Sequence, residues 1–393
     1  MPESTVIRRA AQVLRQVEEG LPADQALRAA LPRTRHRSAP AERREISRAV
    51  FSHFRWLRWL DPRHPVARRL EEALRLQERF NRTPALFKPE TLAARVVPDW
   101  CADAIDWPDV SADGAALARP GPIEAAWLGQ LQREPTLWIR TKSGMRESVA
   151  LALGDCLPAA APARAAAPST ALRYGGTPDL FTTAAYRAGD FEIQDLASQL
   201  VGLACAPRPG ETWWDACAGE GGKTLHLADL MRNQGLIWAS DRSARRLARL
   251  KERAARARMF NYRAALWDGT RPPVRTKFDG ILVDAPCSGL GTWQRNPHAR
   301  WTTFPRDVRE LAAVQTRLLD RVAGSLKPGG RLVYAVCTLT RAETSAVART
   351  FGAAHPDFEP APVWPDSAGA STAVVWPQEW DANGMFLATW RRK

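Results

Sequence analysis

The chain has 393 residues, with 56 lysines and arginines against 42 aspartates and glutamates, and a formal net charge of +14. This length predicts two or three domains, and 45% hydrophobic residues are enough for a substantial core. No apolar run approaches the roughly 20 residues of a membrane span, and no apolar segment follows Met1–Ser4 as in a secretory signal. We therefore expect a cytoplasmic chain with no membrane partner.

The cysteines are scattered and form no C-x-x-C pair, which predicts neither a disulfide framework nor a zinc site. We therefore expect no bound metal. The basic excess is concentrated in residues 201–393, which hold 28 basic and 18 acidic side chains. Such an excess favours a polyanionic partner such as nucleic acid. An arginine-rich composition without functional meaning is the alternative.

Residues 1–118 show helical periodicity. Apolar residues recur at helical spacing over 6–17, 23–31, 41–60 and 66–80, and weaker helical stretches follow near Thr91 and Trp100. Nothing in this region has catalytic spacing. A structural bundle and an RNA-contacting bundle both fit, the second through its arginines Arg33, Arg35, Arg37, Arg43 and Arg44.

The next segments predict a linker and a small α+β module over 119–200. Residues 109–122 are rich in Pro, Gly, Ala and Asp, as linkers are. A helix is expected over 123–132, a strand over 136–141 and a helix over 147–153. The Ala/Pro segment 158–168 is expected to be a loop.

Residues 205–393 alternate strands and helices, which is typical of a parallel sheet. We expect strands at 211–216, 235–240, 261–265, 278–283 and 330–336. Helices are expected at 222–232, 243–257, 306–324 and 341–351. Two late strands, 372–376 and 384–390, predict an antiparallel hairpin at the edge of the sheet.

The stretch Thr212–Thr224 reads T-W-W-D-A-C-A-G-E-G-G-K-T. A buried strand, a glycine turn and a helix in this order open nucleotide-type sites in open α/β sheets. An ordinary tight turn is the structural alternative. A phosphate loop would need glycine where Cys217 stands, five positions before Gly222, so an NTPase is disfavoured.

Chemistry-bearing side chains follow several of these strands. Asp241, Asp268 and Asp284 come at the ends of successive strands, where ligands bind in open α/β sheets. Cys287 and Cys337 also lie at strand ends. One such cysteine is usually a small buried hydrophobe, but two at one edge favour catalysis.

Four motifs carry a family resemblance: D-A-P-C-S-G-L-G-T, R-N-P-x-x-x-W, Y-x-x-C-T and D-x-C-A-x-x-G-G-K-T. Together they resemble the RsmB/Nop/Sun family of RNA cytosine-5 methyltransferases over about 190–340. Residues 1–118 resemble the NusB-like RNA-binding domain of the bacterial RsmB branch. The resemblance implies a class I methyltransferase domain over 201–393, with a Rossmann-like, seven-stranded, mostly parallel sheet.

The resemblance also implies roles for single residues. S-adenosyl-L-methionine would be held by the glycine turn, with Asp241 at the ribose, Asp268 by the adenine, and Asp284 also near the cofactor. Cys337 matches the nucleophile, Cys287 the cysteine that assists product release, and Asp284 with Lys223 the polar pair beside the target base. The turn residues are Cys217, Ala218, Gly219, Glu220, Gly221, Gly222 and Lys223. The residues expected to contact RNA are Arg295, Asn296 and Arg300.

This residue set suits the implied chemistry. A thiolate that adds to carbon 6 of cytosine makes carbon 5 nucleophilic, and nearby positive charge, for which Lys223 is a candidate, lowers a thiol pKa. The chain departs from the family where Gly219-Glu220 replaces Ala-Pro, which puts a carboxylate near the methionine end of the cofactor. Val336 and Thr338 also depart from the usual residues around the nucleophile.

The expected function is methyl transfer to carbon 5 of a cytosine in small-subunit ribosomal RNA, by a monomer. Transfer RNA is the alternative substrate, and a non-catalytic RNA-binding or ribosome-assembly factor is the rival class. The intact cysteines argue against that rival. The arginine-rich helix Arg242–Met259 is either a solvated face or a second contact with the RNA backbone.

Overall fold

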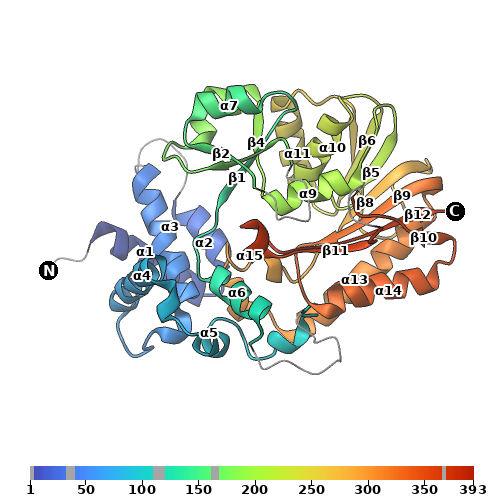
Figure 1. The fold of residues 1–393 in the computed structure, drawn as a ribbon. Helices are drawn as coiled ribbons and strands as arrows, with labels where there is room; N and C mark the ends of the chain where they lie inside the picture. The colour runs from blue at the N-terminus through green and yellow to red at the C-terminus, as the bar shows by residue number, and fades with distance from the viewer. Residues whose placement is uncertain (1–3, 32–39, 109–119, 161–167, 365–368) are drawn as a thin grey trace. The chain divides into compact units, whose positions relative to one another are not determined.

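The computed structural model describes residues 4–31, 40–108, 120–160, 168–364 and 369–393 (Figure 1). The chain forms two compact units. The first unit contains residues 1–135 and 292–303, and the second contains 136–291 and 304–393. This division does not coincide with the expected boundaries at residues 118 and 200. The small module and the large sheet share one unit, and the short segment 292–303 packs with the first.

The first unit is helical. Its helices are α1 (Thr5–Glu18), α2 (Ala23–Ala30), α3 (Pro40–Arg55), α4 (Val66–Arg82), α5 (Pro89–Arg95), α6 (Pro122–Leu131) and α12 (Ala299–Thr302). Ser4 caps α1 by accepting a hydrogen bond from the N–H of Ile7 at 3.2 Å. The apolar faces of α1 to α4 form one core that includes Val13, Ile46 and Leu70. The expected helical region is confirmed, although α3 ends at Arg55 and a 3-10 turn follows. Of the expected arginines, Arg33, Arg35 and Arg37 lie outside the described residues.

The small module in the second unit has a four-stranded antiparallel sheet in the order β2-β3-β1-β4. Its strands are β1 (Leu137–Thr141), β2 (Cys156–Pro158), β3 (Ala171–Tyr174) and β4 (Phe191–Ile193), with helices α7 (Arg146–Leu153) and α8 (Ala184–Ala188). Only β1 and α7 were expected, because strands of three or four residues are too short to show periodicity. Of the expected loop 158–168, residues 161–167 lie outside the described residues.

The large sheet has the order β10-β12-β9-β8-β5-β6-β7, with β11 also paired to β12. The parallel strands are β5 (Thr212–Asp215), β6 (Leu236–Asp241), β7 (Tyr262–Leu266), β8 (Phe278–Asp284) and β9 (Leu326–Val336). β10 (Phe358–Pro360), β11 (Thr372–Val375) and β12 (Met385–Arg392) add antiparallel pairs, giving eight strands rather than the expected seven. The β11–β12 pairing is confirmed, but β12 lies inside the sheet, between β9 and β10.

Helices cover both faces of this sheet, as a parallel sheet requires (Figure 1). On one face, α9 (Leu196–Cys205), α10 (Gly222–Leu230) and α11 (Ala244–Arg256) pack with Trp213, while α13 (Pro305–Ala323) and α14 (Ser345–Ala354) pack with Trp214 on the other. The Rossmann-like fold is therefore confirmed. β5 is the first strand of the sheet in chain order, with β6 and β7 on one side of it and β8 and β9 on the other. The switch point where ligands bind in such sheets thus lies between β5 and β8.

Candidate active site

The glycine turn after β5 leaves open space beside the backbone. Gly219 and Gly221 have φ values of +56° and +85°, which favour glycine. A Cβ atom on Gly221 would lie 2.6 Å from Cγ of Leu250, whereas one on Gly219 would meet no atom within 4 Å. The N–H of Ala218 donates to the carbonyl of Ser240 at 2.8 Å. The turn is therefore anchored to the end of β6 and open at Gly219.

Two of the predicted carboxylates lie at the same edge of the sheet, Asp241 as the last residue of β6 and Asp268 just after β7. Asp241 is nearly buried and accepts hydrogen bonds from the N–H of Gly219 at 3.0 Å and of Ser243 at 2.8 Å. Asp268 is exposed, and hydrogen bonds from the hydroxyl and N–H of Thr270 lower its pKa. Glu220 is also exposed, so its carboxylate is not packed into the turn. Asp241 is therefore rigidly placed, while Asp268 and Glu220 face solvent.

Lys223 and Asp284 meet at the switch point. Lys223 lies in the first turn of α10 and Asp284 ends β8, and Nζ of the lysine is 2.6 Å from Oδ2 of the aspartate. Burial lowers the pKa of Lys223, but the charge and hydrogen bond of Asp284 outweigh it, so the pKa is raised overall. The negative form of Cys337 also raises that pKa. A stable cation therefore lies within electrostatic reach of Cys337.

The structure brings Cys287 and Cys337 together. The parallel register pairs Asp284 of β8 with Ala335 of β9, so the chain segments after the two strands run side by side. The two Sγ atoms are 3.4 Å apart, and the N–H of Gly291 donates to the carbonyl of Cys337 at 3.0 Å. The hydrogen bond with Cys337, followed by burial, raises the pKa of Cys287 well above its usual value. The convergence of the two sulfurs expected from the sequence is therefore found.

The other cysteines near the large sheet have different surroundings. Burial raises the pKa of Cys205 and Cys217 far above the usual value, as expected for thiols that do not ionise. Cys217 packs against the apolar cluster around Trp214. At Cys217 the glycine turn therefore offers a ligand only backbone groups and a protonated thiol.

Two buried carboxyl groups in this region were not predicted as site residues. Asp215 ends β5, accepts a hydrogen bond from Oγ1 of Thr224 at 2.6 Å, and burial raises its pKa to about 7. Glu343 is fully buried and contacts the segments after both Cys287 and Cys337. No spacing rule marks Glu343. The only signal is an acidic residue in the polar stretch that directly follows a buried strand and a cysteine.

The residues expected to contact RNA belong to the first unit. Arg300 is fully buried and donates to the carbonyls of Trp293 and Leu131 and, at 2.9 Å, to Oε1 of Gln132. A guanidinium bound in this way holds its own unit together, so the expectation that Arg300 contacts RNA is corrected. Arg295 is exposed, and Asn296 is half-buried.

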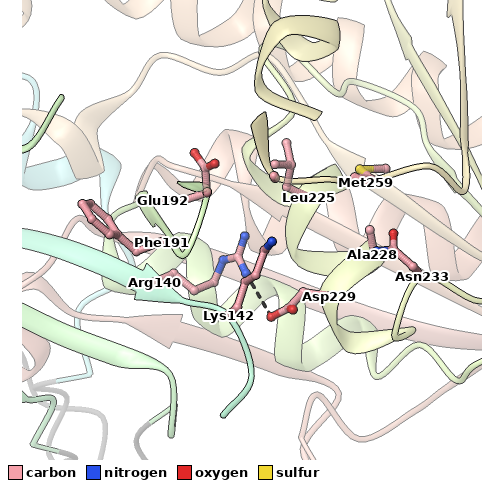
Figure 2. Close-up of a pocket in the computed structure, with 11 residues that line it drawn as sticks. Arg140, Lys142, Phe191, Glu192, Leu225, Ala228, Asp229, Asn233 and Met259 are labelled. Carbon is pink, nitrogen blue, oxygen red and sulfur yellow. Dashed lines mark hydrogen bonds and ion pairs between the residues drawn. The ribbon is translucent and has the colours of Figure 1, made fainter. Parts of the chain in front are cut away.

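A separate pocket lies among β1, β4, α10 and the end of α11 (Figure 2). Arg140 projects into it, donating to Oε1 of Gln194 at 2.6 Å and to Asp229 at 3.4 Å. Cys287, Cys337 and the glycine turn do not line this pocket. Its buried Arg140 already donates hydrogen bonds to protein atoms. We therefore treat it as distinct from the candidate site.

The described residues hold no group of three or more His, Cys, Asp or Glu side chains arranged to bind a metal ion. No helix among them has the length and apolar character needed to cross a membrane.

The covered parallel sheet, the open glycine turn at its switch point and the carboxylates after β6 and β8 define a Rossmann-like methyltransferase domain. Residues 202–391 match the family described as 16S rRNA methyltransferase RsmB/F. This part of the chain is therefore similar to the methyltransferase domain of that family.

Curated relatives carry names from the same family. A probable ribosomal RNA small subunit methyltransferase B from Synechocystis is 36% identical over 56% of this chain and 52% of its own length. Its namesake from Bacillus subtilis is 40% identical over 44% of this chain and 40% of its own length. The chain thus spans about half the length of the relatives it matches, or less. The solved structure of PH0851 is 23% identical, with a TM-score of 0.77 over 100% of this chain and 99% of the other, and shows a shared fold.

Proposed function

We propose that this protein transfers a methyl group from S-adenosyl-L-methionine to carbon 5 of a cytosine in small-subunit ribosomal RNA. The names of the relatives support the ribosomal substrate, and a net charge of +14 suits a polyanion. Transfer RNA is the alternative substrate of the same chemistry.

The residues of the glycine turn fit the proposed cofactor. The space beside Gly219 and the carboxylate of Asp241 would accept a methionine end and a ribose, respectively. Asp268, exposed after β7, would lie by the adenine. The bound cofactor would supply an electrophilic methyl group. Glu220 faces solvent, so it need not oppose binding.

The thiol pair and the ion pair would act on the base. The thiolate of Cys337 would add to carbon 6, and the electrons of the carbon 5–carbon 6 double bond would become available at carbon 5. Lys223 would stabilise the thiolate, and the proton shared within the Lys223–Asp284 pair would be presented to N3 of the base. Once carbon 5 has accepted the methyl group, loss of its proton to water would re-form the double bond and expel Cys337 as a thiolate, assisted by Cys287.

One observation carries the proposal: the 3.4 Å separation of the Cys287 and Cys337 sulfurs in the same site as the Lys223–Asp284 pair. A non-catalytic RNA-binding or assembly factor would need the fold and the positive charge, but it would not need two converging thiols and a buried cation.

The direct test uses RNA that contains 5-fluorocytidine, which lacks the proton that must leave. The wild-type protein, supplied with S-adenosyl-L-methionine, should form a covalent adduct that survives denaturation. Cys337→Ala should form none while still binding the cofactor, and Cys156→Ala, which alters a cysteine of the small module, should behave as wild type. Bisulfite sequencing of cellular RNA with and without the gene would identify the substrate. An adduct formed by Cys337→Ala would refute the nucleophile assignment.

A further inference from the structure

We propose that Glu343 is a positioning residue that ties the segment after Cys287 to the segment after Cys337, and so holds the two thiols together. This inference rests on the proposed function for its catalytic meaning. The claim that Glu343 holds the two segments together does not depend on that function.

The carboxylate contacts the neighbour of each cysteine. Its Oε1 accepts a hydrogen bond from the backbone N–H of Ser288, which directly follows Cys287, at 2.8 Å. Its Oε2 accepts hydrogen bonds from the hydroxyl of Ser288 and, at 3.3 Å, from that of Thr338, which directly follows Cys337. One side chain therefore touches both segments, one residue beyond each sulfur.

Further donors complete the shell around Glu343. Oε1 also accepts from Nε2 of Gln315 at 3.0 Å, and Oε2 accepts from the hydroxyl of Thr340 at 2.8 Å. Gln315 in turn donates to the carbonyl of Pro286, directly before Cys287, at 2.9 Å. A fully buried carboxylate surrounded by five donors is satisfied in place. Removing it would leave the half-buried N–H of Ser288, directly after Cys287, without its acceptor.

The backbone of Glu343 is itself fixed to the sheet. The hydroxyl of Tyr334 in β9 donates to the carbonyl of Glu343 at 2.6 Å, and is also 3.0 Å from Oε1 of Gln315. The carboxylate is thus a rigid link from the sheet to both cysteine segments. Its charge also contributes, after Cys337 and burial, to the raised pKa of Cys287, which keeps the second thiol protonated.

Three substitutions separate position from charge. In Glu343→Gln, the amide oxygen can accept from Ser288 and Gln315, and the two N–H groups of its NH₂ can donate to two of the three hydroxyls, so the link is largely kept and the charge is lost. Glu343→Ala removes both. Glu343→Asp keeps the charge but is one methylene too short to reach both segments. Glu359→Ala is the matched control, because it removes the side chain of a glutamate that is exposed on β10 in the same unit.

The readout is the rate of disulfide formation between Cys287 and Cys337 with diamide, which takes up the two electrons and two protons of the thiol pair. Peptide mass spectrometry measures this rate without any methyl transfer. We expect Glu343→Ala and Glu343→Asp to slow it at least about tenfold, and Glu343→Gln to match or exceed the wild-type rate. Glu359→Ala should remain within about twofold of the wild type. A wild-type rate in the folded Ala variant, or in the Asp variant if the Ala variant does not fold, would overturn the proposal.

Turnover then tests the catalytic meaning. Glu343→Ala and Glu343→Asp should lower kcat for RNA methylation while the KM for the cofactor stays within about twofold, and Glu343→Gln should recover part of kcat. Unchanged kcat in both disrupting variants would limit Glu343 to a structural role. If the wild-type protein methylates no RNA, the proposed function fails, and the oxidation rates still decide whether Glu343 holds the thiols together.

Discussion

Nζ of Lys223 lies 2.6 Å from Oδ2 of Asp284, although the two residues come from different elements and are 61 positions apart in the chain. The fold produces this contact, because α10 begins after β5 and β5 is hydrogen-bonded to β8. The pair lies where the sheet order reverses, beside the segments that carry the two thiols. The ion pair and the two thiols are therefore supplied by segments at the ends of the neighbouring parallel strands β5, β8 and β9.

Replacing Cys287 with alanine should trap an RNA adduct. The thiol that assists release would be absent while Cys337 still attacks, so a complex with ordinary cytosine RNA should survive denaturing electrophoresis. Glu343 and Gly291 would still hold the Cys337 segment. Free turnover without an accumulated adduct would argue against the release role.

The Lys223–Asp284 pair should be coupled. Lys223→Gln leaves Asp284, and Asp284→Asn leaves the more deeply buried Lys223, without a countercharge. The double variant should therefore be destabilised by less than the sum of the two single variants. We expect a coupling energy of roughly 1–3 kcal/mol in urea unfolding. Additive effects would indicate that solvent screens the pair. Lys327→Gln with Asp279→Asn, a more exposed pair in the same unit, is the control and should give a smaller value.

The carboxyl group of Asp215 should make stability depend on pH. Its pKa rises from 3.8 to about 7 on folding because it is buried, so the folded state holds a proton that the unfolded chain has lost. The contribution of this carboxyl group to the free energy of unfolding is fully present below its pKa in the unfolded chain. It is lost as the pH rises through about 7. Asp215→Asn should therefore exceed the wild type in unfolding free energy near pH 8 by on the order of 1–4 kcal/mol, and match it near pH 4. A constant difference across this range would contradict the assignment, and Glu359→Gln on exposed β10 should show no such pH dependence.

Two arginines of segment 292–303 should behave differently. Arg300→Met removes a buried cation with several protein acceptors, so the first unit should lose roughly 3 kcal/mol or more of stability in thermal unfolding. Arg295→Ala, at an exposed position, should leave stability within about 0.5 kcal/mol and weaken RNA binding. If Arg300→Met unfolds as the wild type does and binds RNA less tightly, Arg300 contacts RNA after all.

The exposed arginines of α11 should contribute to RNA affinity. Arg242, just before α11, and Arg245 and Arg249 within this helix of 13 residues are exposed, whereas Arg253 and Arg256 bind Glu192. Changing the three exposed arginines to glutamine should weaken RNA binding and reduce the slope of log affinity against log salt by about 2 to 3. The matched control changes Arg309, Arg317 and Arg349, exposed on α13 and α14 across the sheet. Equal losses in both triple variants would mean that only net charge matters.

Local patterns in the chain were enough to predict much of the fold and part of the site. Strands and helices of the large sheet repeat their apolar residues with different periods, and the glycine turn must follow a strand and precede a helix. Those features are enough to place Lys223 and the strand-end groups Asp284, Cys287 and Cys337 at one edge of the sheet. The roles of these residues stay predictions until the variants are measured.

The tertiary structure alone decided the rest, because those features depend on contacts between distant segments. β12 lies inside the sheet through pairing with β9, which no hydropathy pattern specifies. Arg300 looked like an RNA contact from its charge, but packing buried it among acceptors of its own unit. Glu343 has no local signature. Its proposed positioning role depends on five donors from three stretches of chain, which converge on one fully buried carboxylate.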